Sequence, residues 1–101
     1  MAKEALVACR LSHAELRQRE TTLLAQFKSA VIATEEPDEG YLFRLPGDKK
    51  YFALVTEVLW AERDCCPFLR FELTPEPNQG PLELRLTGPA GTKDFLRSVL
   101  I

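Results

Sequence analysis

Residues 69–86 read L-R-F-E-L-T-P-E-P-N-Q-G-P-L-E-L-R-L, and this stretch decides the fold class of the chain. Apolar side chains occupy every second position on both sides of its Pro- and Gly-containing centre, and mostly charged side chains lie between them. A period of two is typical of strands with one buried and one solvated face. The stretch therefore predicts an antiparallel hairpin of residues 69–73 and 82–86. On its solvated face we expect cross-strand charge pairs among Arg70, Glu72, Glu83 and Arg85.

A helical pattern precedes this hairpin over residues 48–66, and Pro67 ends it because its ring prevents continuation of the helix. On a helical wheel, Glu62 falls near the middle of the apolar arc, with Cys65 and Cys66 one turn further on and to either side. The arc itself consists of Tyr51, Phe52, Leu54, Val55, Val58, Leu59 and Ala61.

The sequence of the first half of the chain predicts a second unit of the same kind, a helix followed by a hairpin. Apolar residues of 12–32 recur at helical spacing, and Ser12 with Glu15 forms a capping-box pattern at the start. Residues 41–45 alternate like a strand, and the segment before the turn at 35–40 could pair with them as a hairpin.

The two ends complete the expected architecture. The apolar run Ala5–Arg10 is a candidate initial strand, and residues 90–100 predict a final helix after Gly88 and Pro89. Two strands follow each of the first two helices, so one helix-β-β unit would be used twice. We expect a two-layer α+β fold, with an antiparallel sheet and helices on one face, in a single domain over residues 1–101.

Composition narrows the class of protein. The 101 residues are 46% hydrophobic and 28% charged, with a formal net charge of −2 and no basic block, so neither nucleic acid nor an anionic membrane is an expected partner. The apolar stretch Ala5–Ala8 is too short for a signal peptide. Three cysteines, two of them adjacent, do not form a secreted disulfide framework. We expect a cytoplasmic protein with free thiols.

The vicinal thiols are the main concentration of chemistry in the sequence. The Cα atoms of Cys65 and Cys66 lie about 3.8 Å apart, closer than an unstrained disulfide prefers. Two such thiols could instead bind a soft ion, either Zn, Cu(I) or a toxic thiophilic metal, with Glu62 as a further ligand and Cys9 or His13 completing the site. Against this, a helix C-terminus disfavours thiolates, and free cysteine often simply packs in a core.

A family resemblance rests on the same residues. The segment E-R-D-C-C-P-F-L-R-F-E-L (residues 62–73), followed by residues 80–96, resembles small uncharacterised bacterial proteins that share an E-R-x-C-C-P-F-L signature. Similar segments are appended to some regulators of the mercury-resistance (MerR) type, which implies a metal or stress context. The signature falls on Glu62, Arg63, Cys65, Cys66, Pro67 and Phe68.

Two functional hypotheses follow. The first is a thiol module that binds a soft metal ion or senses oxidants through Cys65 and Cys66, with Glu62 as a ligand or tuning neighbour. The second is a non-catalytic interaction domain, a homodimer joined through sheet or helix faces, in which the E-R-D-C-C-P-F motif is structural. An enzyme with Glu62 as a general acid or base ranks third, because no orienting triad can be assembled.

Three other features have ordinary explanations. The segment T-G-P-A-G-T-K (residues 87–93) does not satisfy the phosphate-loop pattern, so helix capping is its better explanation. His13 is expected to be a surface residue. Trp60 lies on the polar arc of the second long helix, where we favour coverage by the N-terminal helix over a partner surface.

Overall fold

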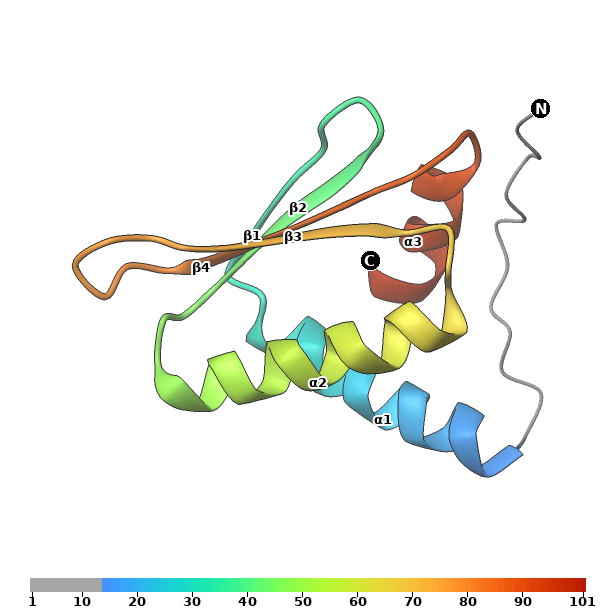
Figure 1. The fold of residues 1–101 in the computed structure, drawn as a ribbon, viewed down its shortest axis with the longest axis horizontal. Coiled ribbons are helices and arrows are strands. Elements are labelled where there is room, and N and C mark those ends of the chain that lie inside the picture. The colour runs from blue at the N-terminus through green and yellow to red at the C-terminus, as the bar shows by residue number, and fades with distance from the viewer. Residues whose placement is uncertain (1–13) are drawn as a thin grey trace.

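The computed structural model describes residues 14–101. Seven elements follow one another in this range (Figure 1): α1 (Ala14–Ala30), β1 (Ala33–Glu35), β2 (Gly40–Leu45), α2 (Lys49–Cys65), β3 (Arg70–Pro75), β4 (Leu82–Thr87) and α3 (Thr92–Leu100). This order confirms the predicted α+β class and both predicted hairpins. The candidate strand Ala5–Arg10, the capping residue Ser12, and Cys9 and His13 lie outside the described residues.

The four strands form one antiparallel sheet in the order β1-β2-β4-β3. Each hairpin contributes one central and one edge strand, and the two central strands, β2 and β4, pair with each other. In that register Tyr41 lies opposite Leu86, and Phe43 lies opposite Leu84. The non-local β2–β4 pairing therefore joins the two halves of the chain.

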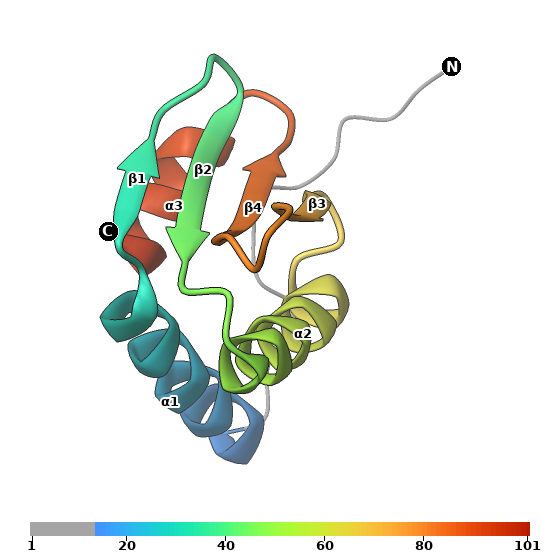
Figure 2. The same cartoon turned by 90° about the vertical axis from the view of Figure 1, so that its left-hand side faces the viewer.

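The core lies between this sheet and the helices, which pack together and against it (Figures 1 and 2). Leu82, Leu84 and Leu86 of β4 are all at most 2% exposed, as their alternation predicts. The rings of Phe27 from α1 and Phe43 from β2 meet edge to face with centroids 5.3 Å apart. Burial of a large apolar side chain contributes about 1.5–3 kcal/mol, so these positions supply much of the stability.

The other face of the sheet carries charge pairs. Arg44 of β2 donates hydrogen bonds to Glu35 of β1 and to Glu83 of β4, and these two bonds raise the pKa of Arg44. Glu72 of β3 lies opposite Arg85 of β4, with 3.9 Å between Oε1 and Nε. Cross-strand pairing of charges is thus confirmed. The partner of Glu83, however, is Arg44 of β2, which lies on the opposite side of β4 from β3.

Two aromatic residues of α2 differ from expectation. Phe52 belongs to the predicted apolar arc but is 37% exposed, because it lies at the margin of the arc. Trp60 is 74% exposed, so the expected coverage by the N-terminal helix is wrong. Helix α1 packs beside α2 without covering this ring. Across residues 14–101, no helix has both the length and the apolar character that a membrane crossing requires.

The close approach of β2 and β4 gives a first prediction. A Cβ atom on Gly40 would overlap the carbonyl oxygen of Leu86 and lie 2.8 Å from its carbonyl carbon, and neither backbone atom can move away easily. We expect Gly40→Ala to lower the free energy of unfolding by about 3 kcal/mol, measured by urea denaturation. Gly80→Ala is the matched control, because its nearest contacts are 3.1 Å. Equal losses in the two variants would contradict the close approach of the strands at Gly40.

Candidate functional site

The signature segment forms the end of α2 and the turn into β3. Glu62 and Cys66 are one helical turn apart and therefore share a face of the helix. The backbone N–H of Cys66 donates to the carbonyl of Glu62 over 2.6 Å, and Cys66 is the C-cap residue, where the helical conformation ends. The N–H of Leu69 then donates to the carbonyl of Cys66 over 3.1 Å. These bonds turn the chain directly into β3.

The side chains of Glu62 and Cys66 meet inside the protein. The Sγ–H group of Cys66 donates to Oε1 of Glu62 over 3.4 Å, and Cys66 is 0% exposed while Glu62 is 5% exposed. Glu62, which the helical wheel placed near the middle of the apolar arc, is thus buried in the folded chain. A buried carboxylate is costly unless it is hydrogen-bonded or neutralised, so the thiol contact supplies part of what burial requires. An ionised thiol beside an ionised carboxylate would be disfavoured by repulsion.

The remaining signature residues divide between core and surface. Phe68 is 9% exposed, and its ring meets that of Phe95 from α3 edge to face at 5.2 Å. Arg63 and Pro67 are exposed, and the side chain of Cys65 lies outside the described part of the chain. The structure therefore brings Cys66, Glu62 and Phe68 into or beside the core.

The predicted metal site is not assembled by the described residues. Within residues 14–101, excluding side chains such as that of Cys65 which are not described, no three His, Cys, Asp or Glu side chains are grouped so that they could hold an ion. Glu62 and Cys66 alone offer one oxygen and one sulfur ligand. A soft-ion site at Cys65, Cys66 and Glu62 stays a prediction.

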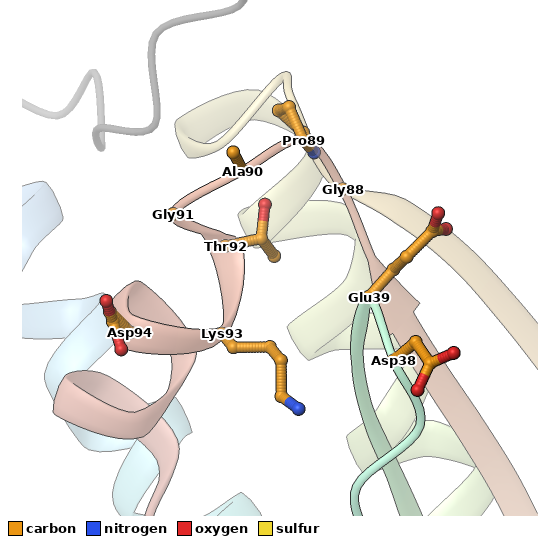
Figure 3. A pocket seen from close by; sticks show the side chains of 9 residues that line it. All are labelled: Asp38, Glu39, Gly88, Pro89, Ala90, Gly91, Thr92, Lys93 and Asp94. Atoms are coloured by element: carbon orange, nitrogen blue, oxygen red, sulfur yellow. The ribbon is translucent and has the colours of Figure 1, made fainter.

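A surface pocket lies at the N-terminus of α3 (Figure 3). It has a volume of about 440 Å³ and is lined by residues 88–94 of the loop and helix start and by Asp38 and Glu39 of the β1–β2 turn. Gly91 is the N-cap residue of α3 with φ 95°, a backbone conformation that glycine adopts without strain. Capping therefore explains this glycine, as expected.

Charges around this pocket do not favour a phosphate group. Three carboxylates line it, those of Asp38, Glu39 and Asp94. The ammonium of Lys93 is 2.7 Å from Oε2 of Glu36, and this hydrogen bond lowers the pKa of Glu36. The one lysine of the loop is therefore already engaged by an acidic residue.

The hydroxyl of Thr92 is an unexpected feature of the same loop. Thr92 is 1% exposed, and its Oγ1 has no hydrogen-bond partner among the described residues. A Cβ atom on Gly88 would lie 2.5 Å from this Oγ1, so Gly88 leaves the space that the hydroxyl occupies. Sequence reasoning missed Thr92, since a threonine in a helix start is normally solvated or capping.

The β3 edge of the sheet is a second candidate site. Among the strands of residues 14–101, β3 pairs with β4 alone and stands at the edge of the sheet opposite β1 (Figure 2). Its inward-facing Phe71 and Leu73 are half-buried, whereas Arg70 and Glu72 are exposed. Strand β1, the other edge, has only three residues. The alternation of residues 69–73 predicted the strand but could not show that it lies at an edge.

The chain matches no protein-family model, no curated protein and no solved structure. The resemblance to the E-R-x-C-C-P-F-L proteins therefore stays a prediction from the residues themselves.

The buried hydroxyl gives a second prediction. We expect Thr92→Val to raise the free energy of unfolding by about 1 kcal/mol, because valine keeps the shape and removes a buried donor without a partner. Thr92→Ser, which keeps the hydroxyl and removes the methyl group, should lower it by a similar amount. Thermal and urea denaturation measure both. A loss of stability in Thr92→Val would mean that the hydroxyl makes a hydrogen bond.

Proposed function

We propose that this chain is a non-catalytic interaction domain that associates with a second copy of itself. In this proposal the segment Glu62–Phe68 is structural: it ends α2 and positions β3. The observation that carries the proposal is the contrast between this segment, whose Cys66 is fully buried, and β3, whose outer edge pairs with no other described strand.

The signature side chains support a structural role because their contacts are internal. Cys66 donates to Glu62, and Phe68 packs on Phe95. A thiol that is 0% exposed does not meet a substrate or an oxidant without local opening of the structure. In this proposal the segment therefore fixes the position of β3, the strand that follows it.

The sheet supports association of like copies. An exposed edge strand presents unpaired backbone N–H and C=O groups, and these are a template for a further strand. Most soluble oligomers are symmetric assemblies of one chain, with two-fold dimers the commonest. A strand of six residues such as β3 is long enough to pair, whereas β1 with three is a poor template.

Sedimentation velocity of the full chain over a wide range of concentrations tests the proposal. We expect a reversible monomer–dimer equilibrium under reducing conditions, since free thiols are not needed for the contact. A monomer at every concentration would refute self-association.

The structural role of the thiols gives a third prediction. We expect Cys65→Ser/Cys66→Ser to lower the free energy of unfolding by about 1–2 kcal/mol, because a hydroxyl replaces the buried thiol of Cys66, and to leave the dimerisation constant unchanged. Urea denaturation and sedimentation measure the two effects separately. Ser29→Ala, at an exposed position of α1, is the control for handling and purity. Loss of association in a folded double variant would place the thiols in the interface.

A thiol module is the second candidate, and the contact between Cys66 and Glu62 favours it. Sγ and Oε1 are 3.4 Å apart, so a sulfur and an oxygen ligand converge on one place near the helix end. Zn(II) accepts both ligand types and Cu(I) prefers sulfur. Burial of Cys66 opposes it, because an ion would have to replace core contacts.

Native mass spectrometry separates the two candidates and is the fourth prediction. We expect the reduced wild type to take up no stoichiometric Zn(II) or Cu(I), because Cys66 is fully buried and an ion would have to replace its core contacts. Uptake by the wild type that Cys65→Ser/Cys66→Ser loses would establish the thiol module instead. Binding of Hg(II) alone would report only accessible thiols.

A further inference from the structure

The backbone groups that β3 offers to a partner follow from its ladder with β4. The N–H of Glu76 donates to the carbonyl of Pro81, so residues 76 and 81 form a hydrogen-bonded pair in the register in which Glu72 lies opposite Arg85. In an antiparallel ladder, hydrogen-bonded and non-hydrogen-bonded pairs alternate, so every second pair counted back from residue 76 is also hydrogen-bonded. The backbone groups of residues 70, 72 and 74 therefore point toward β4, and those of Phe71 and Leu73 point outward. Pro75, which has no N–H to offer, also faces outward, as proline does in edge strands.

The side chains around Phe71 are self-complementary. The segment Leu69-Arg70-Phe71-Glu72-Leu73 has leucine at both ends and opposite charges at equal distances from the central phenylalanine. If two such strands run antiparallel with the Phe71 residues facing each other, leucine meets leucine and Arg70 meets the partner's Glu72 twice. Opposite charges directly across a strand pair are stabilising.

We propose that two copies pair edge to edge through β3, antiparallel, with Phe71 on the two-fold axis. This inference rests on the proposed self-association and names its surface. The two sheets, of four strands each, join into one continuous sheet. The half-buried Phe71 becomes covered by the partner's Phe71, and the half-buried Leu73 by the partner's Leu69.

The charges also select this register over its neighbours. A shift that places Glu72 opposite the partner's Glu72 keeps the backbone bonds but sets like charges directly across from each other, which is destabilising. A further shift, centred on Leu73, brings Pro75 into the ladder at a position that requires an N–H. The register centred on Phe71 gains two charge pairs and sets no like charges across from each other. Its missing donor is the N–H of Leu69, which bonds to the carbonyl of Cys66 in its own chain.

The charged groups are available for these pairs. Arg70 and Glu72 are 75% and 45% exposed at their side chains, and the distance between Nε and Oε1 within one chain is 3.8 Å. The contact of Glu72 with Arg85 is 3.9 Å. Exposed ion pairs of this length contribute little, so a partner's guanidinium does not have to displace a strong bond.

Charge reversal tests the register and is the fifth prediction. Arg70→Glu places glutamate opposite glutamate twice in the dimer, and Glu72→Arg places arginine opposite arginine twice. We expect each variant alone to dimerise about tenfold more weakly than wild type in sedimentation experiments at low salt. An equimolar mixture of the two should dimerise as well as wild type, because both cross-strand pairs are then of opposite charge. The double variant Arg70→Glu/Glu72→Arg should also recover.

Matched controls use the same charge changes far from the edge. Lys28→Glu on α1 and Glu57→Arg on α2 are exposed and should leave the dimerisation constant as in wild type. Circular dichroism melts of all four single variants verify folding, which matters most for Glu72→Arg because it faces Arg85 in its own chain.

The outcomes separate this inference from the proposed function. If the wild type dimerises and neither charge reversal weakens the dimer, the proposal of self-association stands and the proposal of a β3 interface is refuted. A wild-type monomer would overturn both. A monomer whose Phe71 and Leu73 amides resist hydrogen exchange at high dilution would show that the edge is covered within one chain, which also refutes the β3 dimer.

Discussion

The inner face of the two central strands is the constraint on which the fold depends. Every second residue of β4 is buried, and Phe43 and Leu45 of β2 are at most 1% exposed. Because successive residues of a strand face opposite sides, a shift of one residue in the β2–β4 register would turn these side chains to solvent and bring charged ones inward. Helices α1, α2 and α3 pack against this apolar face of the sheet and cover it. Gly40 permits the close approach at one end of this pairing.

At the end of α2, the polar side chains of Glu62 and Cys66 are buried in contact with each other. Glu62 is exceptional in an otherwise apolar face, and its burial would be costly if it were isolated. Its contact with Cys66 lies at the residue where the helix ends and the chain turns toward β3. Removing one partner of such a buried pair leaves the other less satisfied, which costs more than the bond itself contributes. This contact makes Glu62 and Cys66 part of the core, which is consistent with the structural role proposed for them.

Local periodicity predicted the elements well, since alternation over 69–73 and 82–86 and helical spacing over 48–66 are short-range signals. The strand order was beyond it, because pairing of β2 with β4 joins segments some forty residues apart and depends on tertiary packing. The wheel placed Glu62 near the middle of the apolar arc but could not decide whether the side chain is buried. It could not show the exposure of Trp60 either, because coverage depends on where α1 lies. Thr92 carried no signal, since its burial arises from the loop at Gly88.

In the dimer proposed above, the charged residues of β3 have two roles. Natural sheets discourage indiscriminate pairing with charges and prolines at their edges, and β3 carries Arg70, Glu72 and Pro75. If these charges had the same sign, two facing β3 strands would repel each other in every register. Because the charges are opposite and lie symmetrically about Phe71, the two strands repel each other in one register and attract each other in another. Pro75 limits how far the pairing can slide, because it removes a donor from the outer edge. The features that make this edge a poor template for unrelated strands are thus compatible with one specific pairing with itself.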